Sequence, residues 1–287
     1  MFFFYLCEIY KNMTYDKEFL KQVLSVPTKT YKEDMMIDFI TDWLRKENIP
    51  FIVDDHYNVY ATKQTGEVDS EFYFPCLVSH TDTVHNIDTI NVFEEQKPNA
   101  QGELKLSLKA YNDENKPTGI GGDDKAGIFA CLTLLKKLPN VKAAFFVSEE
   151  TGCHGSKYAD KRFFENVGYA IQFDSPENWM VSEYLMGIPL FERTSEFGKT
   201  CMEILTESLP SNHSYMRHPY TDVFALKTLF DFSCINIPIG YYQYHTKNEY
   251  VVVEDVFNGI KIAENMIERL GNNLHYLKSN QGRQILV

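Results

Sequence analysis

Apolar and polar residues along this chain form segments of two kinds. Stretches with apolar residues at helical spacing, or with a helix-forming composition, predict helices over residues 15–26, 33–47, 123–138, 221–230 and 253–270. Shorter apolar runs predict strands over residues 58–61, 72–79, 90–95, 104–109, 142–148, 169–173 and 233–237. The runs 72–79 and 142–148 are continuous rather than alternating, which is typical of strands buried on both faces. The order of elements predicts a three-layer α/β/α fold with a mixed, largely parallel central sheet.

The predicted domain organisation is simple. The chain has 287 residues, enough for one large domain, and it shows no internal repeat or low-complexity linker. We predict a single domain over residues 13–272, an N-terminal extension over 1–12 and a C-terminal tail over 273–287. Glu8 interrupts the apolar run of the extension, and no basic region precedes that run, so it does not match a signal peptide or a membrane helix. A cytoplasmic location is the resulting expectation.

Net charge and cysteine content narrow the classes of partner. The formal net charge is -12, which argues against nucleic acid or an anionic membrane as the main partner. None of the six cysteines forms a C-x-x-C pair, so a structural zinc site of that kind is not expected. Because most of them lie inside apolar stretches, we expect buried free thiols, as in a reducing compartment.

Histidines and carboxylates follow the predicted buried strands or open a predicted helix. They are His80, Asp82, Asp123, Glu149, Glu150, Asp174 and His245. In a doubly wound sheet, functional groups gather beyond the carboxyl ends of the strands. Imidazole and carboxylate groups suit Zn²⁺, and two-metal sites activate a water molecule beside a carboxylate that serves as general base. Each motif alone is weak evidence, but together they predict a site for two divalent metal ions.

The same residues carry a resemblance to a known family. The matching motifs are Ser79-His80-Thr81-Asp82-Thr83, the run from Gly121 to Ile128 (GGDDKAGI), the run from Val147 to Gly152 (VSEETG), Phe173-Asp174 and the run from His245 to Glu249 (HTKNE). In this order, over roughly residues 15–270, the chain resembles the co-catalytic zinc exopeptidases, a superfamily that includes peptidase T and acetylornithine deacetylase. The expected fold of that family agrees with the predicted layers.

The resemblance implies a role for each metal ligand. Asp123 would be the carboxylate that bridges the two metal ions. His80 and Asp174 would complete one site, and Glu150 and His245 the other. The implied cofactor is two Zn²⁺ ions per chain, with Co²⁺ or Mn²⁺ as alternatives.

Two further residues receive catalytic roles from the resemblance. Asp82 would hydrogen-bond the far nitrogen of His80, which fixes the tautomer of that ring. Glu149 would be the general base that takes a proton from the metal-bridging water, leaving hydroxide, and passes it to the leaving amine.

In one respect the chain departs from peptidase T and its lid-bearing relatives. Those relatives carry a dimerising lid domain between the aspartate ligand and the last histidine, whereas residues 175–244 are too few here for a lid and the last elements of the domain. Thr221-Asp222 at a predicted helix start is similar to the single-domain zinc aminopeptidases, so no inserted lid is expected. Without a lid, the group that stabilises the oxyanion stays open among His213, His218, Tyr241, Tyr242 and Tyr244.

The favoured function is an aminopeptidase-type exopeptidase that acts on peptides. Acidic surroundings suit the cationic amino terminus of such a substrate, and Glu177, Glu183 and Asp222 are open candidates for contacting it. The first alternative is an N-acyl amino acid amidohydrolase or deacylase, in which Arg193 or Arg217 would bind a substrate carboxylate.

The second alternative belongs to another class: a non-catalytic binding domain that retains the fold. It is disfavoured because Glu149 and all five ligand positions carry chemically competent residues. The oligomeric state is left open by the sequence.

Overall fold

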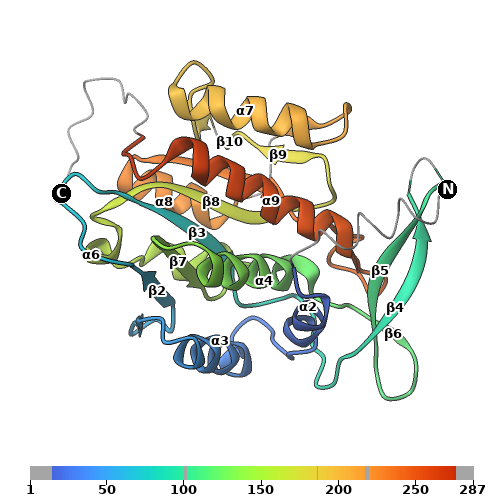
Figure 1. Cartoon of the computed structure of the whole chain (residues 1–287). Helices are drawn as coiled ribbons and strands as arrows, with labels where there is room; N and C mark the ends of the chain where they lie inside the picture. The colour runs from blue at the N-terminus through green and yellow to red at the C-terminus, as the bar shows by residue number, and fades with distance from the viewer. Residues whose placement is uncertain (1–14, 100–101, 186, 217–219, 276–287) are drawn as a thin grey trace.

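The computed structural model describes residues 15–99, 102–185, 187–216 and 220–275, and its largest element is an eight-stranded sheet (Figure 1). The strand order is β1-β2-β7-β3-β8-β13-β9-β12. The strands are β1 (Phe51–Val53), β2 (Val59–Lys63), β3 (Phe74–His80), β7 (Val141–Phe146), β8 (Val167–Ser175), β9 (Met180–Ser182), β12 (Ser214–Met216) and β13 (Ser233–Pro238). The central pairs β7–β3, β3–β8 and β8–β13 are parallel, whereas β1–β2 and β2–β7 are antiparallel. The predicted mixed, largely parallel sheet is confirmed.

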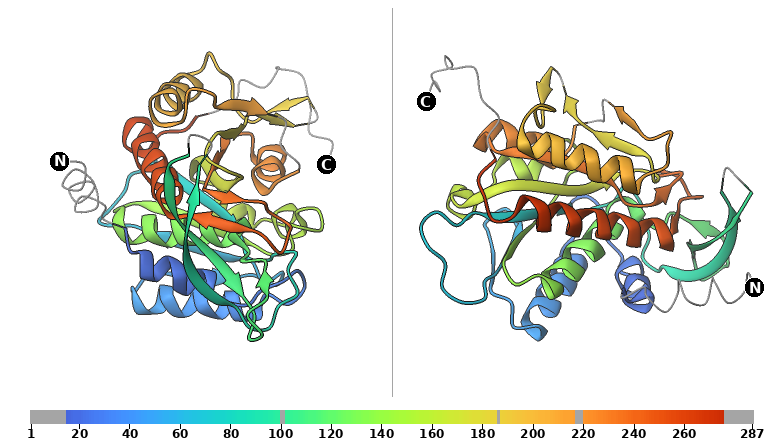
Figure 2. Two further views of the ribbon diagram at one scale, coloured as in Figure 1. Left: turned by 90° about the vertical axis from the view of Figure 1, so that its right-hand side faces the viewer. Right: turned by 45° about the horizontal axis from the view of Figure 1, so that its top comes forward.

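Helices cover both faces of this sheet. They are α2 (Lys17–Leu24), α3 (Asp34–Lys46), α4 (Gly122–Lys137), α5 (His154–Lys157), α6 (Lys161–Phe164), α7 (Glu196–Ser208), α8 (Asp222–Phe230) and α9 (Val253–Leu270). Helix α4 packs on β3 and β8 and contacts α2 and α9, while α8 packs with α5 on the opposite face (Figures 1 and 2). Because helices lie on both sides, every residue of β3 and β8 is buried, which explains their continuous apolar runs.

A second, smaller sheet lies at one end of the molecule, at the right of Figure 1 and facing the viewer in the left view of Figure 2. It consists of β4 (Asn91–Pro98), β5 (Leu104–Tyr111), β6 (Pro117–Thr118), β14 (Tyr241–Tyr242) and β15 (Tyr250–Val252). The order is β14-β15-β5-β4, and β6 pairs with β5. The sequence predicted the strands β4 and β5 but neither their pairing nor this separate sheet, because β6, β14 and β15 are too short to show a periodicity.

The predicted helices and strands are all present, with boundaries shifted by up to a few residues. Within the described residues, the one long helix that the prediction missed is α7, although Phe197, Cys201 and Ile204 are buried on one side of it. The described residues between Asp174 and His245 complete the large sheet and its covering helices, apart from β14 of the smaller sheet and the small hairpin of β10 (Tyr184–Leu185) and β11 (Ile188–Pro189). This agrees with the expectation that no lid domain is inserted there.

The cysteines and the chain ends bear on the remaining sequence predictions. The five described cysteines are free and buried, as expected, and Cys7 lies outside the described residues. No helix within the described ranges is long and apolar enough to cross a membrane. The predicted extension 1–12 lies outside the described residues. At the start of the predicted tail, His275 is buried, and its carbonyl oxygen accepts a hydrogen bond from Ser233 N at 2.7 Å.

Candidate metal centre

Three neighbouring parallel strands end at one edge of the large sheet, and a candidate residue lies at each end. His80 is the last residue of β3, Asp174 lies next to the last residue of β8, and Glu150 follows β7. The order β7-β3-β8 brings these ends side by side. Asp123 comes from the start of α4, which packs on β3 and β8, and His245 comes from the segment between β14 and β15. Residues far apart in the sequence therefore meet at one place.

Asp123 lies between the two histidines. Its Oδ1 is 3.1 Å from His80 Nε2, and its Oδ2 is 3.2 Å from His245 Nε2. His80 Nε2 is also 3.8 Å from Asp174 Oδ1. His245 Nε2 is 3.0 Å from Glu150 Oε2. Two histidine–carboxylate pairs are thus joined by one shared carboxylate, an arrangement that suits two metal ions.

The chemistry of this cluster fits bound divalent cations. Single ligand atoms of His80, Asp123 and Glu150 lie within 4.8 Å of one another. Glu150 Oε1 is buried and has no hydrogen-bond partner among the described residues. Within the described part of the chain, Asp123, Asp174 and Glu150 form ion pairs with histidine only. Because buried carboxylates need a compensating charge, and because imidazole and carboxylate suit Zn²⁺, the residues present match a pair of such ions.

In the absence of cations, the carboxylates favour protonated histidines. Burial lowers the pKa of His80, but hydrogen bonds to carboxylates including Asp123 and Asp174 raise it well above the usual range. Hydrogen bonds to Asp123 and Glu150 raise the pKa of His245 to about 10. Both rings must lose a proton before their Nε2 atoms can coordinate a metal ion.

This leads to a prediction for metal loading. Near pH 7, binding of zinc to the metal-free protein is expected to release about two protons, one each from His80 and His245. Because protons compete for the same nitrogens below the raised pKa values, the zinc affinity is expected to fall steeply as the pH drops. Calorimetric titrations in two buffers of different ionisation enthalpy measure the proton count. Release of no protons would contradict the assignment of these two rings as ligands.

Asp82 holds both His80 and the segment that follows β7. Its Oδ1 is 3.3 Å from His80 Nδ1, the ring nitrogen that faces away from Asp123. The same carboxylate accepts hydrogen bonds from Glu149 N at 2.9 Å and from Thr30 Oγ1 at 2.8 Å. Asp82 therefore orients the ring of His80 and fixes the backbone at Glu149.

Glu149 lies beside the cluster with only 9% of its surface exposed. Burial raises the pKa of its carboxyl well above the usual range, and the nearby carboxylates of Asp174 and Asp222 act in the same direction. Its carboxylate hydrogen-bonds neither His80 nor His245 among the described residues, but its Oε1 accepts a hydrogen bond from Cys153 Sγ at 3.3 Å. A carboxyl group in such surroundings is suited to exchanging protons near neutral pH.

Comparison with known proteins gives the identity of the fold. No protein-family model and no curated protein matches the chain. The aminopeptidase PepT of Bacillus cereus superimposes with a TM-score of 0.66 at 13% identity, over 88% of this chain and 97% of that one. A tripeptidase of Staphylococcus aureus gives a TM-score of 0.64 at 14% identity, over 87% of this chain and 96% of that one. An aminopeptidase of the archaeon Desulfurococcus kamchatkensis gives 0.61 at 13% identity, over 88% and 94%.

The chain has an aminopeptidase fold. At identities of 13–14% the likeness concerns the fold alone, and this fold agrees with the layers predicted from the sequence. Roles of single residues follow from the geometry of the site in this chain.

One residue of the aminopeptidase fold that sequence reasoning left without a role is Glu249. Its Oε1 accepts a hydrogen bond from Asp123 N at 3.1 Å, and its Oε2 accepts one from Gly121 N at 2.9 Å. Its Oε2 also lies 2.6 Å from His85 Nε2. A Cβ atom on Gly119 would lie 2.0 Å from the ring of His85, so glycine is required for this ring position. Glu249 thereby fixes the backbone of the shared carboxylate, and its place in the matched HTKNE motif was the available signal.

Asp174 is held by three groups that the sequence analysis did not combine. Thr221 Oγ1 lies 2.8 Å from Asp174 Oδ2, and Tyr241 OH donates to Oδ1 at 3.2 Å. Gln172 Nε2 is 3.4 Å from Oδ2, and Gln172 Oε1 accepts a hydrogen bond from Val223 N. The start of α8 is thereby tied to the candidate ligand Asp174 at the end of β8.

Several candidates for contacting the substrate are engaged elsewhere. Glu183 and Arg193, considered for opposite ends of a substrate, form an ion pair with each other, with Oε2 and Nη2 2.5 Å apart. Asp222 is fully buried and so cannot meet a substrate amine directly. Glu177 accepts a hydrogen bond from Trp179 Nε1.

Most of the described candidates for the oxyanion-stabilising group are also engaged in other contacts, and only Tyr244 is exposed. Tyr241 is buried and bound to Asp174, and Tyr242 OH donates to Asp255 Oδ2 at 2.6 Å. His213 Nδ1 lies 2.9 Å from Pro210 O. Tyr244 is exposed and packs edge-on against the ring of His245. The remaining oxyanion candidate, His218, lies outside the described residues, as does Arg217, the second arginine considered for a substrate carboxylate.

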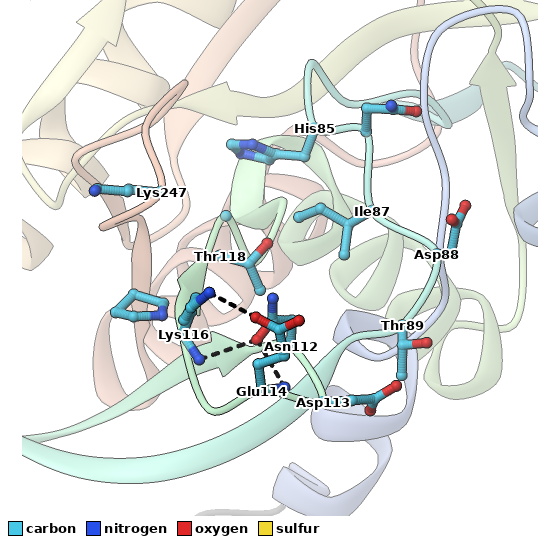
Figure 3. A pocket seen from close by; sticks show the side chains of 13 residues that line it. His85, Ile87, Asp88, Thr89, Asn112, Asp113, Glu114, Lys116, Thr118 and Lys247 are labelled. Atoms are coloured by element: carbon cyan, nitrogen blue, oxygen red, sulfur yellow. Dashed lines mark hydrogen bonds and ion pairs between the residues drawn. The ribbon is translucent and has the colours of Figure 1, made fainter.

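An open hollow of about 770 Å³ is lined by residues that lie close in sequence or by contact to the candidate centre (Figure 3). His85, which is bound to Glu249, and Lys247, two residues after His245, are part of its wall. The opposite wall is the turn between β5 and β6, where Lys116 Nζ pairs with Glu114 at 2.6 Å.

Proposed function

We propose that the chain is a two-metal peptidase of the aminopeptidase type, which removes residues from the amino terminus of peptides. The observation that carries this proposal is the position of Asp123 between His80 and His245. Each histidine has its own further carboxylate, and a buried glutamate with a raised pKa lies beside the cluster. The fold supports a peptidase because it is shared with two aminopeptidases and a tripeptidase.

The residues divide into two ligand sets with one member in common. His80, Asp123 and Asp174 would hold one ion, and Asp123, Glu150 and His245 the other, with Zn²⁺ as the favoured metal and Co²⁺ or Mn²⁺ as alternatives. Two bound divalent cations would supply Lewis acidity, which lowers the pKa of water and polarises the carbonyl group of the scissile bond.

Glu149 performs the proton transfers. Its carboxylate takes a proton from the attacking water and returns it to the nitrogen of the leaving amine. Asp82 supports this step because it binds both His80 Nδ1 and Glu149 N, so the base and the first ligand keep a fixed relative position.

Acidic surroundings favour a peptide with a free amino terminus over an N-acylated amino acid. The chain carries a net charge of -12, and buried carboxylates surround the candidate centre. A deacylase needs a free cation for the substrate carboxylate, but the described candidate, Arg193, is paired with Glu183. The hollow beside His85 and Lys247 offers room for the residues beyond the scissile bond.

Metal content and cleavage of a substrate panel test the proposal together. The purified protein is expected to bind about two zinc ions and to hydrolyse aminoacyl chromogenic amides and short peptides with a free amino terminus. N-acylated counterparts of the same compounds are the matched control and are expected to remain uncut. Dialysis against a chelator should abolish turnover, and zinc, cobalt or manganese should restore it.

The other outcomes point to the alternatives. Cleavage of the N-acylated compounds alone would identify a deacylase. Two bound metal ions without turnover of any amide would favour a non-catalytic binding domain. Absence of bound metal, with no activity after reloading, would refute the ligand assignment itself.

A further inference from the structure

A buried thiol contacts the residue that we propose as general base. Cys153 Sγ lies 3.3 Å from Glu149 Oε1, and the Cys153 side chain has no exposed surface. Among the described residues, no other group hydrogen-bonds the carboxylate of Glu149. The only directional contact that this carboxylate makes within that part of the chain therefore comes from Cys153.

The backbone brings residue 153 back over Glu149. After Glu149 the chain turns, so that Gly152 N and Cys153 N both donate to Glu149 O, at 2.7 and 2.8 Å. Cys153 has a φ of 56°, in the left-handed region, and directs its side chain toward the base. The next turn is tight against β7, because a Cβ atom on Gly155 would lie 2.6 Å from Val147 O. The position of the thiol is thus fixed by the backbone on both sides.

The contact distinguishes the two oxygens of Glu149. The terminal torsion of a glutamate has a broad, roughly two-fold energy profile, so burial alone does not decide which way its carboxylate faces. A thiol carries one proton and is a weak donor, but a charged acceptor strengthens the hydrogen bond. Burial also raises the pKa of the Cys153 thiol above its usual range, so the group keeps that proton. With Oε1 occupied, Oε2 remains for the proton that is transferred.

We propose that Cys153 is a positioning residue for Glu149, whose thiol proton holds Oε1 and so presents Oε2 to the reacting water. This inference rests on the proposed function, because it assigns a role within that reaction. It predicts that loss of the donor slows the proton transfer and leaves substrate binding and metal binding unchanged.

Two substitutions separate a hydrogen-bonding role from a packing role. Cys153→Ala removes the donor, and Cys153→Ser keeps a donor on a side chain that is also smaller than cysteine. We expect kcat to fall by about tenfold or more in Cys153→Ala, with KM and metal content unchanged, and to recover most of that loss in Cys153→Ser. If the thiol only fills space, serine would be no better than alanine, because it adds a buried hydroxyl to the same lost volume.

Cys201→Ala is the matched control for loss of a buried thiol. Cys201 lies in α7, is fully buried, and makes no hydrogen bond through its sulfur among the described residues. We expect this variant to lose thermal stability and to keep the kcat of the original protein. Loss of kcat in Cys201→Ala equal to that in Cys153→Ala would overturn the specific role of Cys153.

The S–H stretching band in the infrared gives a second reading that does not depend on turnover. The difference spectrum between the original protein and Cys153→Ser isolates the band of Cys153, and Cys201→Ala does the same for the reference thiol. A hydrogen bond to Glu149 is expected to shift the Cys153 band to lower frequency and to intensify it. Equal bands would refute the contact, whereas absence of amide hydrolysis in the metal-loaded original protein would refute the proposed function and this role with it.

Discussion

Glu149→Gln is expected to lower kcat by about 10³-fold while leaving about two metal ions bound per chain. Glutamine preserves the shape of the side chain but cannot accept the proton of the attacking water. Metal binding is expected to persist because Glu149 contacts neither His80 nor His245 through its carboxylate among the described residues. Steady-state kinetics on an aminoacyl amide, combined with elemental analysis of the same preparation, measures both quantities.

A matched control separates loss of the base from loss of a negative charge. Glu207→Gln makes the same chemical change on the exposed surface of α7 and is expected to leave kcat and metal content unchanged. If Glu149→Gln kept more than a tenth of the turnover, another group would have to be the base. If it lost its metal ions, Glu149 would belong to the ligand set instead.

The candidate ligands could be named from the sequence because chain order and sheet geometry agree at the strand ends. His80 and Asp174 follow continuous apolar runs, and such runs form parallel neighbouring strands whose carboxyl ends meet. His245 lies on no strand of the large sheet, and no periodicity points to it. It was named because it comes after the predicted strand 233–237, the resemblance of the surrounding motif implied its role, and its position depends on the short strands β14 and β15.

Apart from Asp82, which the resemblance named, the residues that support the candidate ligands could not be predicted, because their contacts form between loops. Glu249 meets Asp123 N only when the Gly119–Gly121 turn and the segment before β15 are folded together. Arg193 and Glu183 each appeared available for a substrate, and their mutual ion pair depends on how the chain folds around β10 and β11. One-dimensional patterns identify residue types near strand ends but do not show which side chains pair with each other.

Removal of the shared carboxylate is expected to abolish metal binding itself, whereas Glu149→Gln is expected to lower kcat with the metal ions retained. Asp123→Ala should reduce the metal content from about two ions per chain to almost none, because both histidines lose the ligand that they share. Asp174→Ala should instead lose about one ion. Of the two candidate histidine ligands, Asp174 forms an ion pair with His80 only, so its removal leaves the pair of His245 and Glu150 intact. Elemental analysis and calorimetric titration with zinc distinguish the two results.

Asp255→Ala is the control for removing a partly buried, hydrogen-bonded aspartate. Asp255 lies at the start of α9, where it accepts hydrogen bonds from Tyr242 OH and Asn178 Nδ2, and its loss should leave two ions bound. In Asp123→Ala, the backbone N–H of residue 123 can still donate its hydrogen bond to Glu249. The circular dichroism spectrum of Asp123→Ala should therefore match that of the metal-free original protein. Equal metal loss in Asp123→Ala and Asp174→Ala would show that the ions bind only as a pair. Retention of both ions in Asp123→Ala would contradict the bridging role on which the proposed function depends.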